Sequence, residues 1–132
     1  MQQFLKITTI LTITLFLTAC GGSSDKQGFS KSGKVAGLDV TYSSKKPLVV
    51  GDNTISVKIM EHGKVFDAND VQFKVFMPEM PGMPYMEEIK TFKANKEGYS
   101  GNVNFSMNGT WQVKIFIKKD AKKYKFSSSI VL

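Results

Sequence analysis

Residues 98–117 read GYSGNVNFSMNGTWQVKIFI, and this stretch decides the fold. Apolar side chains occupy every second position on both sides of Asn108-Gly109, which is typical of strands with one face in a core and the other in water. An Asn-Gly dipeptide between two alternating runs favours a two-residue hairpin turn, so we expect Met107 and Thr110 to pair across it. Trp111 lies in phase with the apolar positions that follow it, and we expect it in the core.

The same alternation recurs through residues 34–132, which we assign to one domain. Strand-like stretches cover residues 38–42, 55–59, 71–77, 87–93, 99–107, 111–118 and 124–132. About seven short strands in about one hundred residues, each with one apolar face, predict two stacked antiparallel sheets. We expect an all-β, Ig-like antiparallel β-sandwich of the constant type. It has no intramolecular disulfide, because the chain contains a single cysteine.

The composition excludes several classes of protein. The chain has 132 residues with one cysteine and one histidine, whereas a Cys/His zinc site needs three or four such ligands. Catalysis of the Ser-His-Asp or Cys-His type would depend on His62 alone. The sequence offers no nucleophile elbow and no phosphate-binding glycine loop, and we expect its acidic residues at turns and on the surface. We therefore predict that the protein is not an enzyme.

The N-terminus predicts export and lipidation. Residues 1–6 are short and weakly basic, and residues 7–19 are apolar but shorter than the roughly 20 residues of a membrane-spanning helix. We assign residues 1–19 to a signal peptide. The run ends in Leu17-Thr18-Ala19-Cys20, which resembles the bacterial lipobox, whose cysteine is lipidated and becomes the first residue. An ordinary secreted protein with a stray cysteine, or an uncleaved anchor, is the alternative.

Acyl chains on Cys20 would anchor the protein to a membrane without a spanning helix. We expect it in the cell envelope, facing the periplasm, and Gly21 after the cysteine favours the outer membrane by the sorting convention of Gram-negative bacteria. Residues 20–33 are rich in glycine and serine and predict a flexible tether that reaches about 20 Å.

The charge of the chain is +7, and every basic residue is lysine. The chain has no arginine, the side chain that most often binds guanine or phosphate through two parallel hydrogen bonds. We therefore expect no nucleic-acid partner. The lysines are spread along the sequence, and we interpret them as a solvated surface that protects sheet edges. Attraction to anionic lipid is the second interpretation.

Residues 77–86 read MPEMPGMPYM and break the alternation. Methionine recurs at every third position, and proline removes three amide donors and favours polyproline II, which has three residues per turn at about 3.1 Å each. The segment would then be a loop with its methionines along one edge, about 9 Å apart. A loop of this kind is where a function is expected.

Thioether sulfur is a soft, neutral ligand that favours Cu(I) and, by the same softness, Ag(I). We predict that Cu(I) or Ag(I) is bound by Met80, Met83 and Met86, with Met77, Met107 and His62 as weaker candidates. In the alternative interpretation Met77 points into the core and the other three methionines cover the open end of the sandwich. If the segment instead docks on a partner, the contact residues are expected to be Pro78, Pro81, Pro84 and Tyr85.

The Met/Pro connection, followed by residues 98–107 and by Asn108-Gly-Thr-Trp-Gln-Val113, resembles the YtkA-like/FixH-like domain family. The resemblance covers residues 34–132 and implies a small Ig-like, membrane-tethered domain. FixH-type members are associated with assembly of copper-containing oxidases, and others accompany metal-efflux machinery. FixH proteins proper carry a transmembrane helix, which this chain lacks. The resemblance therefore implies an accessory role in metal efflux or copper-oxidase assembly, within an envelope protein complex. A docking or scaffolding module is the other function that we consider.

Overall fold

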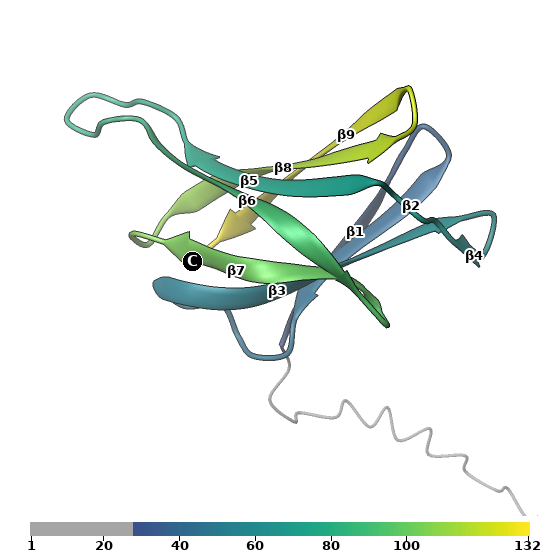
Figure 1. Ribbon diagram of the computed structural model, residues 1–132. Coiled ribbons are helices and arrows are strands. Elements are labelled where there is room, and N and C mark those ends of the chain that lie inside the picture. Colours follow the sequence, from purple (N-terminus) through teal and green to yellow (C-terminus); the bar gives the residue numbers. More distant parts are fainter. Residues whose placement is uncertain (1–27) are drawn as a thin grey trace, which may run out of the picture.

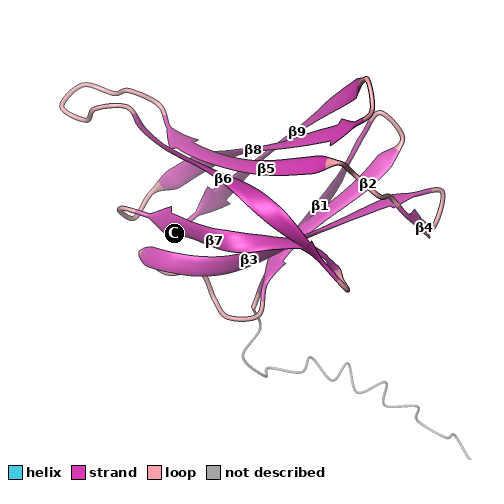
Figure 2. Ribbon diagram, viewed as in Figure 1, coloured by secondary structure: helices cyan, strands magenta, loops and turns pink. Residues whose placement is uncertain are grey.

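The computed structural model describes residues 28–132, and in this range it consists of strands joined by turns and loops (Figures 1 and 2). The predicted signal peptide, Cys20 and most of the predicted tether lie outside the described residues. No helix that would be able to span a bilayer occurs between residues 28 and 132. The strands are β1 (Phe29–Val35), β2 (Leu38–Ser44), β3 (Gly51–Glu61), β4 (Lys64–Val65), β5 (Asp70–Met77), β6 (Met86–Asn95), β7 (Gly98–Phe105), β8 (Thr110–Lys119) and β9 (Lys122–Val131).

The strands pair in the order β1-β2-β3-β7-β6-β5-β8-β9, and the short β4 pairs with β3. All pairings are antiparallel. Strand β6 changes partner along its length: Met86 to Phe92 pairs with β5, and Lys93 to Asn95 pairs with β7. We call β1, β2, β3, β7 and the end of β6 sheet A, and β5, β8, β9 and the first part of β6 sheet B. The orders β2-β3-β7-β6 and β5-β8-β9 match the two sheets of an Ig constant-type domain, which confirms the predicted all-β class.

The core lies between the two sheets and is built from the inward positions of every long strand. In β5 and β8 buried and half-buried residues alternate strictly up to Ile117, as period-two patterning requires. Trp111, which we expected in the core, is only 2% exposed, and the apolar positions in phase with it on β8, Val113, Ile115 and Ile117, are buried as well. The fully buried side chains of largest volume are Trp111, Tyr42, Phe73, Phe105, Leu38 and Ile55.

One polar contact crosses the core near the edges of the two sheets. Tyr42 of β2 is fully buried, and its hydroxyl lies 2.5 Å from the Ser128 hydroxyl of β9. Burial raises the pKa of the Tyr42 hydroxyl, so the phenol is neutral and forms a hydrogen bond with Ser128. Ser128 interrupts the apolar residues on the inward side of β9, and this hydrogen bond explains a serine at that position. Beside it, Lys31 Nζ of β1 donates to the Ser129 carbonyl at 2.5 Å, which joins β1 to β9.

Residues 28–132 contain nine strands where the alternation predicted about seven. The seven predicted stretches correspond to β2, β3 and β5 to β9, and β1 and β4 are additional. Strand β1 begins at Phe29, so residues 29–33 are ordered strand and the prediction of a flexible tether was wrong there. Their serines and lysines hid the strand, because β1 lies at the edge of sheet A with no residue fully buried. Phe29 nevertheless packs on Tyr42 at a ring distance of 5.6 Å.

The predicted hairpin at Asn108-Gly109 was wrong. Strand β7 pairs with β3 and β6, whereas β8 pairs with β5 and β9, so the chain crosses from sheet A to sheet B here. Met107 and Thr110 do not pair. Instead Gly109 extends the β8–β9 ladder by bonding to Leu132. Both flanking strands face the same core, but from opposite sheets, and alternation alone does not distinguish that arrangement from a hairpin.

Candidate functional site

The Met-Pro segment forms the projecting tip of the β5–β6 hairpin, at upper left in Figure 1. Ladder pairing ends at Met77 and Met86, and one further pair of backbone hydrogen bonds joins Met80 to Met83 at 2.8 and 3.1 Å. Pro81 and Gly82 occupy the turn between them. Gly82 has a φ of 81°, which is the conformation that the third position of a type II turn requires.

The predicted polyproline II edge is therefore absent, and with it the row of evenly spaced methionines. Pairing keeps one register from the sheet to the tip, so that Met77 lies opposite Met86 and Met80 lies opposite Met83. Cross-strand neighbours have Cβ atoms about 4.5–5.5 Å apart, closer than the spacing that the sequence predicted. The hairpin thus assembles two methionine pairs, one at its base and one at its tip.

The four methionines differ in exposure. Met77 is 2% exposed and belongs to the core, with its methyl group against Gly109, as the packing alternative expected. Met83 and Met86 are half-buried and pack on the edge of the core, whereas Met80 is 48% exposed at the tip. A ligand that reaches this end from solvent thus meets Met80, Met83 and Met86 and not Met77.

The β7–β8 connection brings a fifth methionine to the same end of the sandwich. Met107 is half-buried against the core, and its carbonyl accepts a hydrogen bond from Trp111 Nε1 at 3.0 Å. Its neighbour Ser106 donates to the Met86 sulfur at 3.3 Å. Met86, Ser106 and Trp111 line a hollow of about 310 Å³, together with Glu87, Glu88 and Asn104. The sulfur of Met86 therefore lies at the surface of this hollow.

His62 lies far from the methionines. It occupies the β3–β4 turn with a φ of 50°, in an exposed Glu-His-Gly sequence. Strand β3 begins at Gly51, opposite Phe105 and close to Met107, and His62 follows eleven residues further along the chain, roughly 35 Å away at about 3.3 Å per residue. The prediction of His62 as a weaker metal ligand was therefore wrong.

A tyrosine in the loop is fixed by its neighbours on sheet B. The Tyr85 hydroxyl donates to Glu87 Oε2 at 2.6 Å, and Lys74 Nζ lies 3.2 Å from the same oxygen. These contacts, the tyrosine first, hold the pKa of the Glu87 carboxyl below its ordinary value. The hydrogen bond to Glu87 likewise raises the pKa of Tyr85 and of Lys74. The Tyr85 ring packs 6.2 Å from Phe76, so the loop is held onto the outer face of β5.

The chemistry available at this end is that of thioethers. Among residues 28–132 no three His, Cys, Asp or Glu side chains lie together as a metal site, so a metal ion here would depend on sulfur. Met80 and Met83 are cross-strand neighbours, and Met86 lies three residues further down the hairpin. Three solvent-accessible thioethers on one hairpin end are donors of the kind that soft monovalent ions prefer.

Comparison with known proteins identifies the domain. The family model described as YtkA-like matches residues 33–116, which is more than half of the chain. The chain belongs to the YtkA-like family. No curated protein and no solved structure is similar enough to match it. The match includes the Met-Pro hairpin and Trp111 and ends at Phe116, before the lysine-rich turn between β8 and β9.

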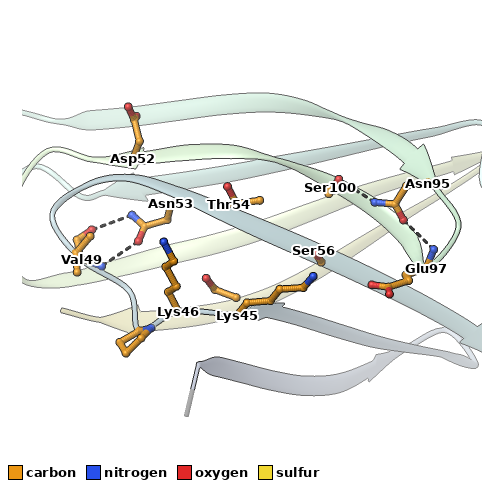
Figure 3. Close-up of a pocket in the computed structure, with 12 residues that line it drawn as sticks. Lys45, Lys46, Val49, Asp52, Asn53, Thr54, Ser56, Asn95, Glu97 and Ser100 are labelled. Carbon is orange, nitrogen blue, oxygen red and sulfur yellow. Dashed lines mark hydrogen bonds between the residues drawn. The ribbon is translucent and has the colours of Figure 1, made fainter. Parts of the chain in front are cut away.

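The YtkA-like domain carries a second, larger groove of about 770 Å³ on the outer side of sheet A (Figure 3). The β2–β3 loop forms one wall with Lys45 and Lys46, and β3 and β7 supply polar side chains below it. Asn53, which is buried, holds this loop through three hydrogen bonds to the backbone of Val49 and Gly51. The sequence indicated this position only as a turn, and the groove was not predicted.

The groove gives no indication of a particular ligand. Its lysines are balanced by Asp52 and Glu97, and hydroxyl side chains such as Thr54 line the rest. In the described part of the chain every buried side-chain nitrogen or oxygen has a hydrogen-bond partner. The methionine end is therefore the better candidate site of this YtkA-like domain.

Proposed function

We propose that this protein is a non-enzymatic envelope lipoprotein that binds Cu(I) or Ag(I) through Met80, Met83 and Met86. In this proposal Cys20 carries the lipid anchor and the domain faces the periplasm. The protein acts as an accessory to metal efflux or to copper-oxidase assembly, within an envelope complex. Copper or silver is the cargo, and no catalytic step is assigned to the protein.

The observation that carries the proposal is the convergence of methionines at one end of the sandwich. The β5–β6 register makes Met80 and Met83 direct neighbours, and Ser106 holds the Met86 sulfur beside an open hollow. Met83 and Met86 are half-buried, so their thioethers are partly desolvated before a metal arrives, which favours a soft, weakly hydrated ion over Zn(II) or Mg(II). Methionine is also the sulfur ligand that suits an oxidising compartment, where free thiolates form disulfides.

The assignment of ligands is tested by titrating Ag(I) into the chain of residues 20–132 with Cys20→Ser, labelled at its methionine methyl groups for NMR. The methyl signals of Met80, Met83 and Met86 should shift together and saturate at one equivalent. Met60 serves as the internal control, because it lies near the end of β3 beside the His62 turn, away from the Met-Pro hairpin. Equal shifts of Met60 and of the hairpin methionines would mean that the ion binds without a defined site.

The second candidate function is docking of the loop on a protein partner. Met80 and Tyr85 are each 48% exposed at the projecting tip, and Pro78, Pro81 and Pro84 limit its flexibility. Methionine side chains adapt to apolar partner surfaces. Leucine in place of the loop methionines keeps their volume and removes the thioether, so docking should survive that exchange while metal binding should not.

Anchoring is tested independently of metal. If Cys20 is lipidated, the intact mass of the membrane fraction should correspond to residues 20–132 plus acyl chains. Cys20→Ala should move the protein to the soluble fraction. A Cys20→Ala protein that still sediments with membranes would contradict the lipoprotein assignment.

A further inference from the structure

The positive charge of the domain is concentrated in one hairpin. Residues 28–132 contain sixteen lysines and ten acidic residues, a balance of +6. Residues 110–131, which comprise β8, β9 and their turn, contain six of these lysines and one acidic residue, a balance of +5. The remainder of the described domain is nearly neutral. The lysines that are spread along the sequence are therefore not spread evenly over the molecule.

The pairing register places lysines directly opposite one another in sheet B. The cross-strand pairs are Lys74 with Lys114, Lys118 with Lys123, and Lys119 with Lys122. Like charges at directly opposite positions destabilise a sheet. None of the salt bridges in residues 28–132 involves a lysine of β8 or β9, since the three that form use Lys34, Lys74 and Lys90. The stability of the fold therefore does not explain why lysines stand opposite one another in sheet B.

The outward side of β5, β8 and β9 combines these charges with aromatic rings. We call it the basic face, and it comprises Lys74, Phe76, Lys114, Phe116, Lys118, Lys123 and Lys125. Two carboxylates share this side, Asp70 opposite Lys118 and Glu87 opposite Phe76 and 3.2 Å from Lys74, so five lysines and two acids leave a balance of +3. Its residues alternate with the buried positions of the same strands, and both phenylalanines are half-buried. Lys74 and Lys114 each lie 5.2 Å from the centroid of the Phe76 ring, so that cation–π contacts hold both ammonium groups on the surface.

The basic face lies away from the point where the chain enters the domain. Figure 1 shows the start of β1 in the lower part of the picture, whereas β5, β8 and the turn between β8 and β9 lie in its upper part. A domain tethered through its N-terminus would present the basic face to another protein more readily than to its own membrane. Outside this hairpin the described domain has ten lysines and nine acidic residues, so a second copy offers no net negative charge to the basic face.

We propose that the basic face binds an acidic protein surface. Lysines at fixed positions around two phenylalanine rings fit carboxylates that alternate with apolar side chains on the partner. The lysine-rich turn between β8 and β9 lies outside the residues that match the family model, whereas Lys74, Phe76, Lys114 and Phe116 lie within them. The proposal does not depend on metal binding or on the methionine hairpin.

The test uses poly-L-glutamate as the acidic probe and residues 20–132 with Cys20→Ser as the protein. Binding is measured by fluorescence anisotropy at low and at physiological salt. The face variant replaces Lys118, Lys123 and Lys125 with glutamine. The matched control replaces Lys58, Lys93 and Lys96, which are exposed on other parts of the domain, and changes the net charge equally.

The proposal predicts that the face variant binds at least tenfold more weakly at low salt, while the control stays within about twofold. It also predicts that the face variant is at least as stable as the parent in urea, because an opposed lysine pair has been removed. Equal losses in both variants would indicate non-specific attraction, and a loss of stability would assign the lysines to folding. Tighter, face-dependent binding to phosphatidylglycerol vesicles than to poly-L-glutamate would replace the proposal with membrane docking. Each of these three results would overturn it.

Discussion

Replacement of Trp111 with alanine should remove the largest side chain of the core at the methionine end. Trp111 is 2% exposed and contacts Phe105 edge-to-face at a ring distance of 5.6 Å. Truncation of a buried aromatic to alanine costs about 3–5 kcal/mol, and domains of this size have about 5–15 kcal/mol to lose. The Met107 carbonyl also loses the indole N–H that it accepts at 3.0 Å. We expect a fall in the free energy of unfolding near the upper end of that range.

Urea unfolding followed by far-ultraviolet circular dichroism is the suitable assay, because Trp111 is the only tryptophan and its fluorescence is lost in the variant. Trp111→Phe serves as the matched control, since it keeps an aromatic ring and removes only the N–H donor and part of the volume. Its expected cost is smaller, about 1–3 kcal/mol. A Trp111→Ala protein whose melting temperature lies within a few degrees of the parent would refute this description of the core, since 1 kcal/mol corresponds to about 4–8 °C.

Two further predictions concern the loop and the N-terminal strand. The pKa of the Glu87 carboxyl is held below its ordinary value, so its contribution to stability is present at neutral pH and is lost as the pH falls through that lowered pKa. In Tyr85→Phe an NMR titration should show a higher pKa of Glu87, and an unchanged pKa would contradict the assigned hydrogen bond. A chain that begins at Lys34 lacks most of β1 and should unfold at lower urea than one that begins at Gly28, because Phe29 no longer covers Tyr42; equal urea midpoints would show that β1 adds nothing to stability.

The sequence was sufficient for the class of fold and for the seven strands that contribute to the core. Those strands bury one face, so apolar residues such as Val71, Phe73 and Val75 occupy every second position and predict the strand. Strand β1 buries little, and its serines and lysines show no such alternation. The strand order was not predicted, since the hairpin expected at Asn108-Gly109 would have paired β7 with β8. The change of partner within β6 was not predicted either, because its residues after Phe92 are exposed.

The candidate site was predicted less well than the fold. The sequence singled out the Met-Pro segment, and its assignment as a metal site stays a prediction, but the geometry expected for its methionines was wrong. Local preference of proline for polyproline II was overridden by pairing of β5 with β6, which continues to the tip once Gly82 allows the turn. The six lysines of β8, β9 and their turn are consecutive enough to be seen in the sequence, whereas their positions opposite one another depend on cross-strand register, which local sequence does not display.

The central claim is that the hairpin thioethers bind Cu(I), and a competition titration tests it most directly. Residues 20–132 with Cys20→Ser compete for Cu(I) with a chromogenic chelator under anaerobic conditions, beside the Met80/Met83/Met86→Leu variant and a Met60→Leu control. The leucines preserve volume, so the triple variant should keep the fold, as its circular dichroism spectrum would verify. We predict a single site whose affinity falls at least tenfold, equivalent to about 1.4 kcal/mol or more, in the triple variant and not in Met60→Leu. Equal Cu(I) affinity of the parent chain and the triple variant would contradict the claim.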